Sequence, residues 1–181
     1  LALGKCELEL GQPALAATTL QPLEASEDEY RRDKANRLRG RALVLTGDYE
    51  RALQDLVSAG APVTSPEMLG ALAGLGRADE VNAAIDALIA QRDTAMQWEP
   101  VLTAVGERNP ELGSQVLDRL RAAQLIRPGD LPALLGIDAA RLTGPAREER
   151  LAELARTAPR SDAGDAARLE LTRLHMRAAA T

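Results

Sequence analysis

The chain of 181 residues repeats part of itself at an interval of 36 residues. Residues 3–11 (LGKCELELG) align with residues 39–47 (RGRALVLTG), and the glycines match near both ends of the aligned segments. The matched pairs are Gly4 and Gly40, Gly11 and Gly47, Ala16 and Ala52, and Leu20 and Leu56. Small residues at equivalent positions allow two helices to approach closely. The repeat therefore predicts two similar helical hairpins, each of which reverses at a glycine.

These residues resemble the tetratricopeptide repeat family, whose units pair two helices through small side chains. Gly4 and Gly40 occupy the family's small position in the first helix, and Gly11 and Gly47 occupy its turn. The segment GDYERAL at residues 47–53 is the best match in the chain. The resemblance implies an α-solenoid, a right-handed superhelix of antiparallel helical hairpins.

Two positions depart from the family pattern. Asn36 stands where the family prefers Trp, and Arg39 stands where it prefers Leu. The interval is 36 residues, whereas the family repeats every ~34 residues. The match covers residues 3–23 and 36–60, so residues 1–60 are predicted to form the two hairpins that fit the family best.

The rest of the chain keeps the rhythm of helical hairpins. Helix starts are predicted at Ser65-Pro66 and Asn109-Pro110, since Ser and Asn cap helices and Pro suits the first helical position, and Asp130 is predicted to cap a third helix. Further turn glycines are predicted at Gly76, Gly106 and Gly144, and a last helix at about 162–179. We therefore predict one domain over residues 1–181, with degenerate hairpins and a C-terminal helix in residues 61–181.

Composition independently favours an all-α fold. The chain is 45% hydrophobic but contains only three aromatic residues, Tyr30, Tyr49 and Trp98, whereas β-sheets rely on aromatic and β-branched side chains. The net charge of −5 argues against nucleic acid as the partner. No apolar run approaches the ~20 residues that span a bilayer. Because the chain starts at Leu1 in a helical pattern, we expect an N-terminal segment to be missing; the compartment, cytoplasmic or periplasmic, and the oligomeric state stay open.

Residues for catalysis or metal binding are scarce. His175 is the only histidine and has no evident partner, and Cys6 is the only cysteine, at a spacing suited to a small core residue. The acidic residues between the first two hairpins, Glu24, Glu27, Asp28 and Glu29, are expected to favour the start of the next helix. We therefore predict no catalytic residue, no metal site, no cofactor and no intrachain disulfide; the chain is not expected to be an enzyme.

Residues 131–142 (LPALLGIDAARL) offer an alternative function. They resemble a helix-turn-helix in which Leu135, Gly136 and Ile137 form the turn, as in a DNA-associated regulator. Pro132 and the single basic residue, Arg141, argue against this hypothesis, since DNA binding needs several basic contacts. A third hypothesis is a helical accessory domain of a larger enzyme or assembly.

A basic run at residues 31–41 gives the candidate binding site. On a helix, Lys34, Arg37 and Arg41 form one stripe, whereas Arg39 and the other basic residues project elsewhere as ordinary surface. In the family that the chain resembles, these three positions line the concave, partner-binding face, together with Val44 and, in the first repeat, Lys5. The resemblance implies a non-catalytic protein–protein interaction scaffold that binds a protein or peptide, such as an acidic segment. The alternative is that these side chains are solvated surface paired with the acids at 24–29.

Overall fold

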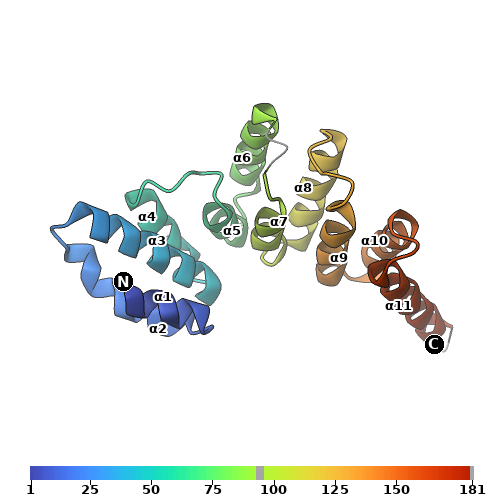
Figure 1. The fold of residues 1–181 in the computed structure, drawn as a ribbon, viewed down its shortest axis with the longest axis horizontal. Coiled ribbons are helices and arrows are strands. Elements are labelled where there is room, and N and C mark those ends of the chain that lie inside the picture. Colours follow the sequence, from blue (N-terminus) through green and yellow to red (C-terminus); the bar gives the residue numbers. More distant parts are fainter. Residues whose placement is uncertain (93–95, 180–181) are drawn as a thin grey trace. The chain divides into compact units, whose positions relative to one another are not determined.

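The computed structural model describes residues 1–92 and 96–179, and these residues form eleven α-helices, one 3-10 helix and no strand (Figure 1). The all-α prediction is therefore confirmed for the described ranges. The chain divides into two compact units, Leu1–Ile85 and Asp86–Thr181, which we call unit 1 and unit 2. Each is described by itself.

Unit 1 begins with two helical pairs. Its elements are α1 (Ala2–Glu9), α2 (Pro13–Leu20), the 3-10 helix η1 (Gln21–Ala25), α3 (Glu29–Thr46), α4 (Tyr49–Ser58) and α5 (Pro66–Gly74), followed by α6 (Ala78–Gln91), in which the division between the units falls. Helix α1 packs on α2, α2 on α3, and α3 on α4, as Figure 1 shows. Helix α5 contacts both α3 and α4.

The two helical pairs have nearly the same closest contact. A Cβ atom added to Gly4 would lie 2.6 Å from Cγ of Leu20, and one added to Gly40 would lie 2.6 Å from Cγ of Leu56. Ala16 is fully buried in α2, as is its equivalent in α4. The internal repeat of the sequence is therefore also a repeat of side-chain packing.

Gly47 shows why the predicted turns form. It follows α3 with φ of 84°, and the backbone N–H of Asp48 donates to the carbonyl oxygen of Leu43 at 3.0 Å. This left-handed conformation is open to glycine without strain and satisfies the last carbonyls of the helix. Gly11 and Gly76 have φ of 70° as well, so these predicted turns are confirmed.

Unit 2 contains α7 (Glu99–Gly106), α8 (Pro110–Ala122), α9 (Leu131–Arg141), α10 (Gly144–Thr157) and α11 (Asp162–Ala178). The prediction of a turn glycine at Gly106 is wrong, because this residue is the last of α7 and lies in helical conformation. Because Gly106 has no side chain, α8 can pack closely against α7 at this point. A Cβ atom added to Gly113 of α8 would lie only 2.7 Å from Cα of Gly106.

Helix starts follow the capping rules at most predicted positions. The Ser65 hydroxyl accepts from the backbone N–H of Met68, and the Asn109 side chain accepts from that of Leu112. Asp130 precedes α9 but makes no capping hydrogen bond, since its backbone is helical (φ −88°, ψ −23°), whereas a capping residue is usually extended. Its carboxylate accepts from Arg127 at 2.7 Å instead. The prediction that the Asp130 side chain caps the helix is therefore wrong, although a helix does start after this residue.

The helix-turn-helix interpretation of residues 131–142 is not supported by the local structure. Leu131–Arg141 is one uninterrupted helix, and the expected turn residues at 135–137 lie inside it. Leu135 is fully buried and α9 packs along α10, so burial of this face stabilises the helix through Gly136.

Candidate functional site

Three of the predicted binding residues line one depression in unit 1. Lys5 comes from α1, and Lys34 and Arg37 come from α3. The remaining lining residues are Tyr30, Asp33 and Leu38, and the depression has a volume of about 530 Å³. The stripe predicted from helical periodicity therefore faces a real concavity, and α1 adds its lysine to it.

Arg41 lies in an adjoining depression of about 210 Å³, which shares Arg37 and Leu38 with the first. Its other lining residues are Leu56, Ala61, Pro62, Ser65 and Glu67. Because the two depressions share residues, we treat them together as the basic groove. It carries four basic side chains against two acidic ones, although the whole chain has a net charge of −5.

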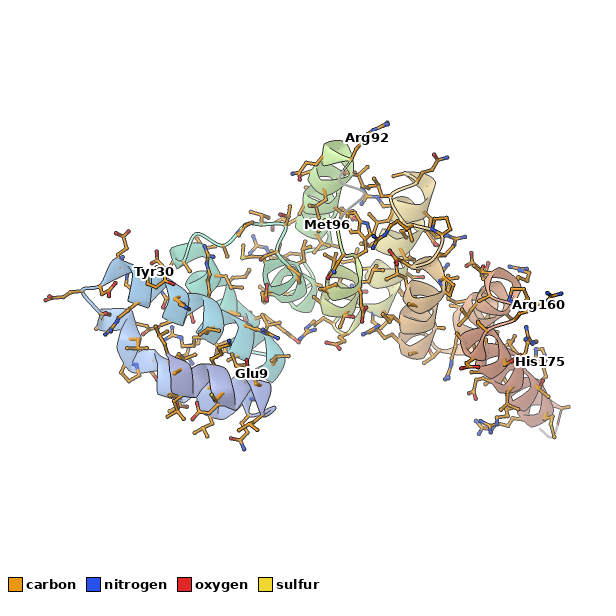
Figure 2. The ribbon with its side chains drawn as sticks, in the orientation of Figure 1. Glu9, Tyr30, Arg92, Met96, Arg160 and His175 are labelled. Carbon is orange, nitrogen blue, oxygen red and sulfur yellow. The ribbon has the colours of Figure 1, made fainter. Side chains whose placement is uncertain are left out.

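Three of the groove's four basic side chains are only weakly engaged within the protein. Lys34 donates to the Tyr30 hydroxyl at 3.4 Å and lies 5.5 Å from the centre of its ring. Tyr30 itself stands out on the surface of α3 (Figure 2). Lys5 pairs with Glu9 at 3.6 Å, but both are exposed, and exposed pairs of this kind contribute little. Among the described residues, Arg41 has no hydrogen-bond or ion-pair partner.

Arg37 has a structural task. Its Nε and Nη2 atoms donate to the carbonyl oxygen of Ala59, at 3.3 and 3.2 Å. Ala59 follows the last residue of α4, so the guanidinium joins α3 to the end of its neighbour. Of the groove's basic residues, Arg37 is therefore the one whose removal would also disturb the hairpin.

The site prediction needs correction at Val44. Its side chain is only 5% exposed, and α3 packs against α2, α4 and α5. The predicted stripe therefore ends at Arg41, and Val44 belongs to the core.

Arg39 is also not where the sequence placed it. This residue was expected to be ordinary surface, but it is 5% exposed and forms two hydrogen bonds with Asp55 of α4, at 2.6 and 2.5 Å. It also pairs with Glu24 of η1. The pairing with an acid at 24–29, which was expected for solvated arginines, occurs here inside unit 1.

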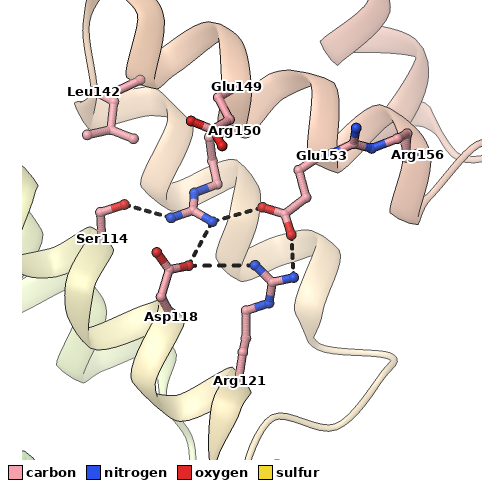
Figure 3. Close-up of a pocket in the computed structure, with 9 residues that line it drawn as sticks. Ser114, Asp118, Arg121, Leu142, Glu149, Arg150, Glu153 and Arg156 are labelled. Atoms are coloured by element: carbon pink, nitrogen blue, oxygen red, sulfur yellow. Dashed lines mark hydrogen bonds and ion pairs between the residues drawn. The ribbon is translucent and has the colours of Figure 1, made fainter.

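Unit 2 contains a second ionic cluster, built around the buried Arg150 and Asp138, that no sequence pattern predicted. Arg150 of α10 pairs with Asp138 of α9 at 2.7 Å and with Asp118 of α8 at 3.0 Å. Its other partners are Ser114 at 2.7 Å and Glu153 at 2.8 Å, and Arg121 contacts Asp118 and Glu153 (Figure 3). We call these six residues the Arg150 cluster. It joins three helices, and all three kinds of guanidinium nitrogen of Arg150 are engaged, which indicates a structural role.

Burial and hydrogen bonding act in opposite directions in this cluster. Burial raises the pKa of the Asp138 carboxyl above its ordinary value, although the hydrogen bond from Ser114 and the charge of Arg150 oppose the change. For Arg150, burial lowers the pKa, but hydrogen bonds with Asp118 and Glu153 outweigh it and the pKa rises. Arg150 therefore stays charged, whereas Asp138 gains a proton at higher pH than an exposed aspartate.

Asp138 is expected to make unit 2 more stable as the pH falls. Its folded-state pKa lies above the ~3.9 of an unfolded aspartate. Between these values the folded chain holds a proton that the unfolded chain releases, so the contribution of this group to the free energy of unfolding is lost as the pH rises.

Urea unfolding followed by the fluorescence of Trp98, the only tryptophan and a buried residue of unit 2, measures this effect. The wild type should gain stability relative to Asp138→Asn as the pH is lowered towards 4. The two proteins differ only at residue 138, so a difference in stability between them that does not change with pH would contradict the prediction.

The two residues considered for catalysis, Cys6 and His175, do not lie in a group of reactive side chains within the described part of the chain. Cys6 is exposed, so the expectation that it is a small core residue is wrong. His175 of α11 lies on the surface (Figure 2), and its side chain is 70% exposed. Its Nε2 atom lies 3.9 Å from Oε2 of Glu148. Within residues 1–92 and 96–179, no group of three or more His, Cys, Asp or Glu side chains could hold a metal ion. None of the helices described is long and apolar enough to cross a bilayer.

No protein-family model, no curated protein and no solved structure matches this chain. Its function therefore has to be argued from its own residues.

Proposed function

We propose that the chain is a non-catalytic protein-interaction scaffold with a tetratricopeptide-like fold, a right-handed solenoid of helical hairpins that binds an acidic protein segment in the basic groove. The observation that carries the proposal is the convergence of Lys5, Lys34, Arg37 and Arg41 on two adjoining depressions. Lys5 comes from α1 and the other three from α3, so two helices contribute to the proposed binding face.

The fold part of the proposal is supported by the first two hairpins. Gly4 and Gly40 make equivalent contacts with Leu20 and Leu56, as already described, and the glycine turns match as well. Repeats of this kind bury their apolar faces against their neighbours, and extended concave surfaces result.

The partner's chemistry follows from the lining of the groove. Leu38, Leu56 and Pro62 are apolar residues of its lining, beside the four basic ones. A carboxylate-rich segment complements the charge of the groove, and apolar side chains of that segment complement these three residues. Complementary charge of this type gives partner selection and fast association.

A direct test is the binding of a fluorescein-labelled peptide of alternating Glu and Leu residues, followed by fluorescence anisotropy at low salt. The variant Lys34→Glu/Arg41→Glu should weaken binding at least tenfold, because like charges would meet in the groove. Arg37 is left unchanged because of its bond to Ala59.

The matched control is Arg51→Glu/Arg77→Glu, which makes the same charge change at exposed residues of unit 1 outside the groove. This control should bind like the wild type, and a peptide with Lys in place of Glu should not bind. Equal loss in both variants would mean that overall charge, and not the groove, attracts the peptide.

A further inference from the structure

One face of α1 is exposed although its equivalent in the repeat is buried. Leu3 is 63% exposed, whereas Arg39, the residue 36 positions later, is 5% exposed. Cys6 is exposed, whereas its equivalent, Ala42, is fully buried. The matched contacts of Gly4 with Leu20 and of Gly40 with Leu56 orient α1 and α3 in the same way towards their hairpin partners, so equivalent residues lie on the same side of the two helices.

Part of the cover of α3 comes from the preceding hairpin, since α2 packs on α3 and Glu24 of η1 pairs with Arg39. Asp55 of α4 completes the surroundings of Arg39 with two hydrogen bonds. Helix α1 has its own hairpin partner, α2, but no preceding helix packs on it within the described residues, and Leu3 and Cys6 are exposed. Within the described residues, nothing takes the place of α2 over Leu3 and Cys6.

We propose that the Leu3/Cys6 face of α1 is a docking surface for an α-helix of a further helical hairpin, which lies on α1 as α2 lies on α3. The interface would continue the α2–α3 packing by one repeat. This inference rests on the repeat alone and is independent of the basic groove.

The chemistry of the docking helix follows from the helix that it would imitate. The sequence of α2, PALAATTL, has no charged residue and contains three alanines, which allow a close approach. Leu3 replaces Arg39, so the new contact lacks the cation that binds Glu24. The surface therefore fits an uncharged helix with small and apolar side chains.

The repeat also limits the surface. Leu10 is 73% exposed, but its equivalent, Thr46, is exposed too, so Leu10 lies beyond the predicted contact. It provides an internal control, because Leu3 and Leu10 are both exposed leucines seven residues apart.

The test adds a second copy of residues 1–36 in front of the complete chain, with Cys6 of the added copy replaced by Ala. The junction is in frame with the repeat, so the added α2 is offered to the native α1. The reaction of the native Cys6 with Ellman's reagent should slow at least tenfold compared with the unextended chain.

Two further variants of the extended chain carry Leu3→Glu or Leu10→Glu in the native part. The first should restore the reactivity of Cys6, and the second should leave it protected. If Cys6 of the extended chain reacts as fast as in the unextended chain, the added hairpin does not dock and the proposal is overturned, whether or not that hairpin folds. Equal effects of the two substitutions would also overturn it, since the contact would then not follow the repeat.

Discussion

Replacing Arg150 with Met is expected to lower the free energy of unfolding of unit 2 by about 3–5 kcal/mol, the range found when one partner of a buried ion pair is removed. Methionine keeps much of the arginine's apolar stem but none of its donors. The carboxylate of Asp138, only 7% exposed, would lose its charge partner inside the protein. Urea unfolding followed by Trp98 fluorescence measures the loss in unit 2.

Two further variants separate charge pairing from packing. Arg156 and Arg150 line one depression of about 350 Å³ in unit 2 (Figure 3). Arg156 is exposed, so Arg156→Met should change stability by less than about 0.5 kcal/mol. The double variant Arg150→Met/Asp138→Leu should recover much of the loss, because no buried charge is then left unpaired. If Arg150→Met is as stable as the wild type, the Arg150 cluster does not hold α8, α9 and α10 together.

Replacing Ala52 with Trp is expected to unfold the first two hairpins of unit 1, at a cost on the order of 4 kcal/mol, above the usual range for overpacked cores. Ala52 is fully buried where α4 meets α3, and a Cβ atom on Gly40 would already lie 3.3 Å from its carbonyl oxygen. An indole ring can enter this contact only if the two helices separate.

Hydrogen exchange resolved by peptide measures the effect, since it follows residues 29–58 separately from unit 2. Val57→Trp is the control, because Val57 lies on the same helix and is 63% exposed. Unchanged protection of residues 29–58 in Ala52→Trp would contradict the close packing of α3 on α4.

Much of the fold was predictable from local sequence patterns. Glycine turns and caps such as Ser65 depend on a few consecutive residues, so they can be recognised without knowledge of distant contacts. The small residues at Gly40 and Ala52 were recognisable because the repeat shows them twice.

Buried charges were missed because their partners are distant in the sequence. Arg150 pairs with Asp118 of another helix, and no local sequence pattern links the two residues. A signal did exist for Arg39, which occupies a position where the repeat family prefers Leu and whose equivalent is Leu3. A basic residue at an apolar repeat position indicates a buried ion pair better than it indicates surface.

The candidate site was predictable in part. Helical periodicity places Lys34, Arg37 and Arg41 on one stripe, and they line the basic groove. Periodicity does not show which neighbouring helices cover a given residue, so it could not exclude Val44, which is buried. It also could not show that Arg37 is bound to Ala59.

The two lysines allow the basic groove to be modified selectively. Lys5 and Lys34 are the only lysines of the chain, and both line the same depression, whereas the buried ionic clusters are built on arginine. Acetylation of side-chain amines would therefore neutralise two charges in the groove and leave Arg39 and Arg150 untouched. An amine-selective reagent can thus alter the proposed binding surface without altering the ion pairs that hold the helices together.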